Sequence, residues 1–276
     1  MLSTVQAYSS WKSAPQLPLS GRGPETDLIQ IRTIDGLDPV KAKVNTVDFG
    51  SIDGAAYNGA LVSSRNIVLT VGLNPDWANY SMEELRRLLY AYFMPKMRTR
   101  LVFHSDDDFP TVEIFGYVEG VETNIFAKDV ELQVSIICPD PYFTAVNPTI
   151  IVGSSNVKQT VVYNGSIAAG MHLKLTELTL PAPANIGVQV GDPAVQFFRV
   201  AASVSATKYF ILNSNPGQKY VQNVELGTGV ITNLLPKMAD GSTWPMFEFG
   251  ENDFTVTTDD GTQEWELTFF EKFGGL

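Results

Sequence analysis

Short runs of alternating apolar and polar residues occur along most of the chain, a pattern typical of β-strands with one buried face. In the first half, the clearest runs cover residues 28–34, 66–73, 98–105, 109–124 and 126–138. Residues 44–59 are instead rich in Gly, Asp and Asn, which predicts an extended loop with little regular structure. Residues 1–26 show no sustained period and predict an irregular N-terminal arm.

One segment has helical periodicity. Ser81 and Glu84 have the spacing of a capping box, in which each side chain accepts a hydrogen bond from the backbone of the other residue. Pro95 ends the predicted helix, Ser81–Met94. Its predicted apolar stripe consists of Leu85, Leu88, Leu89, Tyr92 and Phe93. A single helix among strands indicates an α+β domain over residues 27–145.

The pattern changes near Pro139, Pro141 and Pro148, which predict a domain boundary because proline interrupts strands. From residue 147 onward helical periodicity is absent, and short apolar runs alternate with Asn-Gly, Pro-Gly and Asp-Gly turns. These runs predict an antiparallel β-sandwich over residues 146–276. They cover residues 149–153, 159–165, 171–178, 186–190, 194–200, 209–213, 220–226, 254–258 and 264–270.

Composition narrows the class of protein. The chain is 44% hydrophobic and 18% charged, with no stretch long enough to cross a bilayer and no secretory signal, so we expect synthesis and solubility in a cytoplasm. Its single cysteine, Cys138, lies in an apolar run and predicts a buried thiol; it excludes an internal disulfide. The net charge of −11 argues against a nucleic-acid-binding protein, which needs a basic surface.

Catalytic chemistry is not indicated. His104 and His172 lie in different predicted domains, without a nucleophile motif near either, and both fit ordinary strand or surface positions. Phosphate-binding, dinucleotide-binding and zinc-protease motifs are absent from the sequence. The acidic clusters 106–108 and 259–261 predict hairpin turns, since their spacing does not suit a calcium loop. We therefore predict no enzyme, catalytic residue, cofactor or metal.

Two other clusters allow two interpretations each. Five basic residues stand out in this acidic chain and form either a solvated face or an interface with an acidic neighbour, such as another copy: Arg86, Arg87, Lys96, Arg98 and Arg100. The last three alternate and would share one face of a strand. Four aromatic residues of the second domain are either core or a surface on which sugars stack: Trp244, Phe247, Phe249 and Trp265.

Several short motifs, in their order, resemble the distal tail proteins of tailed bacteriophages. In the first domain they are a GLDP turn, a glycine-rich loop with Tyr57, Arg65 at a strand start, the helix, and the ending CPDPYF at residues 138–143. In the second they are the NPG turn, WPMFEFGEN, and the ending FGGL at residues 273–276. The resemblance covers nearly the whole chain from Leu28 onward.

This resemblance implies a hexameric ring at the tail tip of the virion. The first domain would be a split β-barrel around a channel through which DNA passes without specific binding, and the second a galectin-like or carbohydrate-binding-module-like sandwich. The implied partners are tail-tube subunits, a tail-associated hub protein, and receptor-binding or side-fibre proteins, without membrane insertion. The alternative is a lectin-like protein whose sandwich binds a glycan of the host surface.

Overall fold

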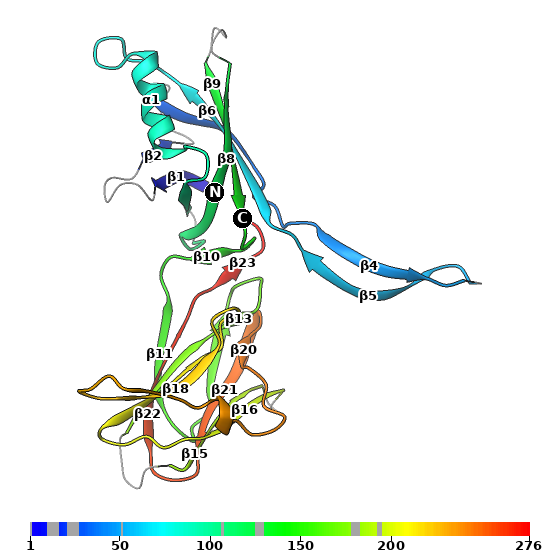
Figure 1. The fold of residues 1–276 in the computed structure, drawn as a ribbon, viewed down its shortest axis with the longest axis vertical. Helices are drawn as coiled ribbons and strands as arrows, with labels where there is room; N and C mark the ends of the chain where they lie inside the picture. The colour runs from blue at the N-terminus through cyan, green and yellow to red at the C-terminus, as the bar shows by residue number, and fades with distance from the viewer. Residues whose placement is uncertain are drawn as a thin grey trace. The chain divides into compact units, whose positions relative to one another are not determined.

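The protein is described by a computed structural model that covers residues 2–9, 17–20, 28–50, 52–105, 108–124, 130–177, 183–191 and 195–276. The chain divides into two compact units (Figure 1). Unit 1 contains Met1–Val146 and Phe273–Leu276, and unit 2 contains Asn147–Lys272. The sequence analysis placed Phe273–Leu276 in the second domain, and this assignment is wrong because the segment packs within unit 1.

Unit 1 is a curled β-sheet with one helix, as predicted. The order of its strands is β23-β10-β8-β7-β1-β2-β3-β6-β9, and β8 also pairs with β9, which curls the sheet into a barrel. One parallel pair, Ser20 opposite Gln30, joins β2 to β3. The strands are β1 (Leu2–Ser9), β2 (Leu17–Ser20), β3 (Ile29–Asp35), β6 (Arg65–Leu73), β7 (Arg98–Ser105), β8 (Val112–Thr123), β9 (Glu131–Cys138), β10 (Phe143–Ala145) and β23 (Lys272–Phe273).

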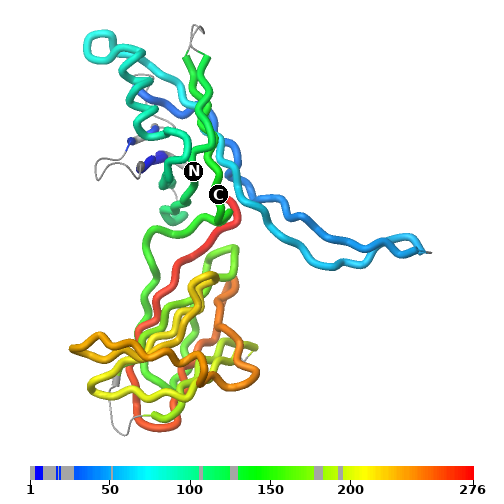
Figure 2. Tube along the Cα trace, viewed as in Figure 1, coloured from blue at the N-terminus to red at the C-terminus, as the bar shows by residue number. Residues whose placement is uncertain are grey.

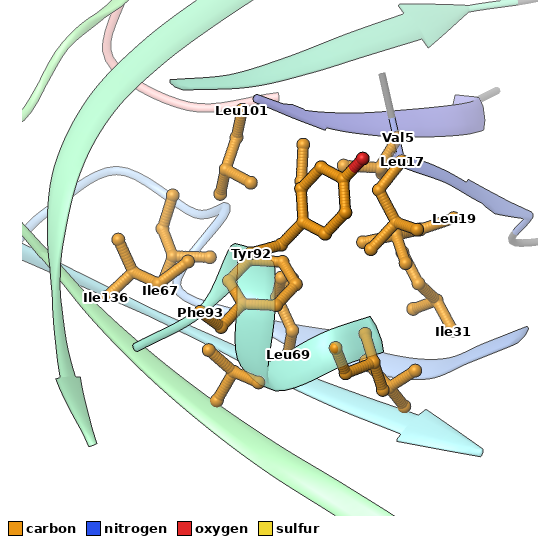
Figure 3. Close-up of a cluster of buried hydrophobic side chains, with 14 of the residues drawn as sticks. Val5, Leu17, Leu19, Ile31, Ile67, Leu69, Tyr92, Phe93, Leu101 and Ile136 are labelled. Carbon is orange, nitrogen blue, oxygen red and sulfur yellow. The ribbon is translucent and has the colours of Figure 1, made fainter. Parts of the chain in front are cut away.

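Two of these strands lie in the predicted irregular arm, so that prediction is wrong for residues 2–9 and 17–20. β1 pairs with both β2 and β7. Its inward side chains Val5 and Ala7 are buried, as are Leu17 and Leu19 of β2. Figure 3 shows Val5, Leu17 and Leu19 in one cluster with Tyr92 of the helix. Two buried apolar positions per strand are too few to give a recognisable period. Pairing with β7 is what makes β1 a strand.

Helix α1 (Met82–Tyr92) has the predicted capping box. The Glu84 amide donates to Ser81 Oγ at 3.3 Å, and the Ser81 amide donates to Glu84 Oε2 at 2.8 Å. Four members of the predicted stripe are buried against the barrel: Leu85, Leu89, Tyr92 and Phe93. Leu88 is 39% exposed and does not belong to the buried face. At 3.6 residues per turn, Leu88 and Phe93 lie at the two opposite edges of the stripe. The edge with Leu88 faces solvent.

The predicted loop at residues 44–59 is also wrong. It belongs to a separate two-stranded sheet formed by β4 (Ala42–Asp48) and β5 (Ala55–Val62). Figure 2 shows the two strands running out together beyond the barrel strands of unit 1. The Gly and Asn residues suggested a loop. In the structure they lie in the connecting turn and at an irregularity in the strand pairing, where Gly59 has φ +117°.

Unit 2 consists of two main antiparallel sheets around a common core, in agreement with the predicted all-β class. One sheet has the order β11-β22-β14-β17-β18-β19 and the other β12-β21-β15-β16, while β13 pairs with β20. The elements are β11 (Thr149–Ser154), β12 (Gln159–Tyr163), β13 (Ala169–Gly170), β14 (His172–Glu177), β15 (Asn185–Val190), β16 (Gln196–Ala201), β17 (Lys208–Asn213), β18 (Tyr220–Glu225), β19 (Ile231–Asn233), the 3-10 helix η1 (Leu235–Lys237), β20 (Met246–Phe247), β21 (Gly250–Thr258) and β22 (Gln263–Phe269).

Two local predictions in unit 2 need correction. The predicted hairpin turn at residues 259–261 is wrong. Asp259 follows β21 of the four-stranded sheet, and the chain continues into β22 of the six-stranded sheet, so this connection crosses between the two sheets. Of the four aromatic residues interpreted as either core or a sugar-stacking surface, Phe247 and Trp265 are buried, and Trp244 is partly buried against the same core, with its ring near that of Phe198. Phe249 is 77% exposed. No helix among the described residues is long and apolar enough to span a membrane.

Candidate assembly surfaces

The structure brings together only some of the predicted basic cluster. Arg98 and Arg100 lie on the outward face of β7, on either side of the buried Thr99. Arg100 forms an ion pair with Glu113 of β8 at 2.5 Å and lies 5.0 Å from the centre of the Tyr8 ring. These two arginines therefore share a strand face, as predicted, although Arg100 already has an acidic partner within its own chain.

The other basic residues are placed differently. Lys96 precedes β7 in a turn and has φ +71°, so it does not continue the alternation of the strand. On α1, Arg86 is half-buried beside the buried face and Arg87 is exposed. Arg98 stacks on the Phe115 ring, with 4.5 Å between the guanidinium carbon and the ring centre. Their role at an interface between molecules stays a prediction.

The β4–β5 hairpin is an exposed apolar surface that the sequence analysis did not find. Every residue of β4 is exposed, and β5 is exposed at all but one position. Its exposed large apolar side chains are Val44, Val47, Phe49, Ile52, Tyr57, Leu61 and Val62. The many apolar residues within this glycine-rich segment could have indicated the surface, but the Gly, Asp and Asn residues suggested a loop.

Strand pairing gives this hairpin an apolar face. Ala42 lies opposite Val62, and Val44 lies opposite Ala60. Side chains two residues apart on a strand point to the same side, so these four form one continuous apolar face at the base of the hairpin. The next pair, Lys43 and Leu61, points to the other side.

A second feature is the buried side chain of Arg65, at the start of β6, which is 2% exposed. Its Nε donates to the carbonyl of Pro141 at 2.7 Å. Nη1 donates to the carbonyls of Gly36 at 2.5 Å and Asp38 at 2.8 Å. Nη2 donates to the carbonyl of Gly274 at 2.5 Å. One guanidinium therefore binds three separate chain segments within unit 1.

These segments are the motifs that the resemblance rests on: the GLDP turn, the CPDPYF ending and the FGGL ending all meet at Arg65. The guanidinium carbon also lies 4.5 Å from the centre of the Phe143 ring. Burial lowers the pKa of Arg65, but the guanidinium stays protonated and charged at neutral pH. Gly36 is required because a side chain there would collide with the Asn66 carbonyl oxygen, 2.1 Å from the position of its Cβ.

Residues considered for catalysis are not assembled into a site. Cys138 is buried, and burial raises the pKa of its thiol to about 12, which keeps the nucleophilic thiolate scarce at neutral pH. His104 belongs to unit 1 and His172 to unit 2. Within the described ranges, no group of three metal-ligating side chains could hold a metal ion. Asp106 and Asp107 of the acidic cluster lie outside those ranges.

Unit 2 offers a hollow of about 460 Å³ on the six-stranded sheet. Its lining includes Lys174, Glu264 and Glu266, and also Trp265, which is 2% exposed. A buried indole cannot act as a stacking surface for a sugar ring, because stacking requires an accessible ring face. This hollow gives the lectin-like alternative no support.

Comparisons with known proteins find one family match, to part of unit 1, and similar solved structures. Residues 25–119, within unit 1, match the phage tail protein RIFT-related domain family. The structure of SPP1 Dit (gp 19.1), described as a paradigm of the hub adsorption apparatus in phages that infect Gram-positive bacteria, is similar with a TM-score of 0.67 and 13% identity, over 98% of this chain and 99% of that one. A chain of the phage P2 baseplate in its activated conformation with Ca has a TM-score of 0.46 and 11% identity, over 100% of both chains. Comparison with curated protein sequences gives no match.

The likeness to SPP1 Dit extends through both units, so it shows that the whole chain shares that fold. The family match concerns the part of unit 1 that runs from β3 into β8. Residues 25–119 of this chain therefore match the phage tail protein RIFT-related domain family, and the chain as a whole has the fold of SPP1 Dit.

Proposed function

We propose that this protein is a structural component of a phage tail tip, where copies of the chain assemble into a ring, six in number as in the distal tail proteins that it resembles. The ring joins the tail tube to the hub and to receptor-binding or side-fibre proteins. The description of SPP1 Dit as part of a hub adsorption apparatus supports this role. The proposed role requires no catalytic chemistry.

The observation on which the proposal chiefly rests is the β4–β5 hairpin. A two-stranded hairpin is marginally stable by itself in water, because it cannot bury enough apolar surface. This one exposes a cluster of large apolar side chains, and such clusters mark interaction sites on soluble proteins. We infer that the hairpin packs on a partner surface in the assembled tail.

Another copy of the chain is the partner that we propose for the hairpin. Residues 41–62 contain two lysines, Lys41 and Lys43, and two aspartates, Asp48 and Asp53, so this segment is neutral in a chain with a net charge of −11. A neutral apolar segment can approach an acidic copy without the repulsion that the rest of the surface would meet. A ring also needs an interface of two different patches, which an arm and its receiving surface provide.

The test measures the oligomeric state of the purified protein by light scattering and electron microscopy. We expect rings for the wild-type chain and a shift toward monomers for the double variant Val44→Ser and Val62→Ser, which removes the apolar face. The matched control is Val195→Ser with Val230→Ser, two exposed valines of unit 2. Rings of the hairpin variant equal to those of the control would contradict the role of the hairpin, and a monomeric wild-type chain would contradict the ring itself.

A further inference from the structure

Unit 1 is assembled from two stretches of the chain that lie far apart in sequence. Met1–Val146 forms the barrel and the hairpin, and Phe273–Leu276 returns to the same unit after the whole of unit 2. Unit 2 is therefore an insertion in unit 1. The last stretch is short, yet each of its residues has a defined contact in the barrel.

The aromatic residue of the segment is the main apolar contact. Phe273 is buried, and its ring centre lies 4.8 Å from that of Phe109, which precedes β8. It belongs to the same core cluster as Phe143 and the barrel strands. Leu276 packs partly against this cluster as well. Both ends of the segment thus bury apolar side chains in unit 1.

Backbone groups fix the segment between these two ends. The Gly274 carbonyl accepts from Arg65, and the Leu276 amide donates to the Leu37 carbonyl at 3.1 Å. Gly275 lies against Pro39: a Cβ at this position would be 2.6 Å from Pro39 Cδ. The site therefore accepts a glycine there and excludes larger residues. Apolar contacts at both ends, with backbone hydrogen bonds and a close approach between them, are features of a peptide-binding site.

We propose that unit 1 contains a binding site for the segment Phe273–Leu276, formed by Leu37, Pro39, Arg65, Phe109 and Phe143, which recognises the segment as a peptide and accepts it from a separate molecule. Because the segment follows unit 2 in the chain, this site stays empty until unit 2 has been synthesised. Full stability of unit 1 therefore depends on synthesis beyond residue 272. Chains that stop within unit 2 lack a ligand of Arg65 and have a weakened barrel.

The test uses hydrogen exchange, followed by mass spectrometry, on the full chain and on three variants. These are a chain that ends at Lys272, the variant Phe273→Ala, and the control Phe270→Ala, which removes a half-exposed aromatic residue of unit 2 three positions earlier. We expect amides of residues 65–73 and 138–143 in unit 1 to exchange about tenfold faster in the first two variants. Amides of residues 220–225 in unit 2 should be unchanged, as should all of unit 1 in the control.

A synthetic peptide with the sequence of residues 271–276 then probes recognition. Added in excess to the chain that ends at Lys272, it should restore slow exchange in unit 1, whereas the same peptide with alanine in place of the phenylalanine should not. If the shortened chain does not fold, the variant Phe273→Ala decides: unchanged exchange around Arg65 in that variant overturns the proposal. Failure of the peptide to restore exchange in a folded shortened chain also overturns it. Neither readout depends on ring formation, so the result is independent of the proposed function.

Discussion

At the scale of single residues, the side chain of Arg65 holds three distant backbone segments together. Its hydrogen bonds join the turn after β3, the segment before β10 and the segment after β23. Planar guanidinium donors point in fixed, divergent directions, which allows one side chain to serve acceptors on several sides. An ammonium group on a shorter and more flexible stem cannot reach all of them.

We therefore predict that Arg65→Lys lowers the free energy of unfolding of the protein by about 2–4 kcal/mol, because buried carbonyls are left without a donor. The matched control is Arg32→Lys on β3, where the arginine is exposed and the change should cost less than about 0.5 kcal/mol. Urea unfolding followed by circular dichroism measures both. Equal free energies for the two variants would show that the hydrogen bonds of Arg65 contribute little.

At the scale of elements, α1 illustrates which parts of a helix can be predicted from sequence. Its start is set by a local interaction between Ser81 and Glu84, which needs no other part of the molecule. Its buried face depends on how the helix is rotated against the barrel. That rotation buries Leu89 and leaves Leu88 partly in solvent, although both belong to the predicted stripe.

The difference between these two leucines is measurable. We expect Leu89→Ala to lower the free energy of unfolding by about 2–5 kcal/mol, because it creates a cavity in the core. Leu88→Ala should lower it by less than about 1 kcal/mol, since an exposed leucine loses little on truncation. Thermal and urea unfolding of the two variants give the comparison. Similar losses in both would mean that the helix packs in another rotation.

At the scale of the whole molecule, charge is a constraint on assembly. Six copies with a net charge of −11 each repel one another, so the proposed ring needs basic surface at its boundaries. Arg100 is a poor probe of this idea because its reversal would also break the ion pair with Glu113. Arg86 and Arg87 on α1 are better probes, since Arg87 is exposed and Arg86 is only half-buried.

We predict that Arg86→Glu with Arg87→Glu weakens self-association, and most strongly at low salt, where screening is least. The control, Lys219→Glu with Lys237→Glu, makes the same change of net charge on exposed positions of unit 2. Sedimentation at several salt concentrations distinguishes them. If both double variants associate equally at every salt concentration, the arginines of α1 form only a solvated face.

The sequence by itself determined the features that depend on local period and local hydrogen bonding. These include the strands with three or more alternating apolar positions, the capped helix, the all-β second half and the burial of Cys138. The motifs near Arg65 were also visible, although nothing local indicated that they meet.

Tertiary structure alone decided the features that depend on long-range pairing. β1 and β2 have too few apolar positions to be recognised, and they exist because β7 and the core give them partners. The β4–β5 hairpin resembled a loop because its side chains face no core within the described chain. The return of Phe273–Leu276 to unit 1 could not be predicted either. Its hydrogen-bond partners and apolar contacts come from residues more than a hundred positions away, which only the folded chain brings together.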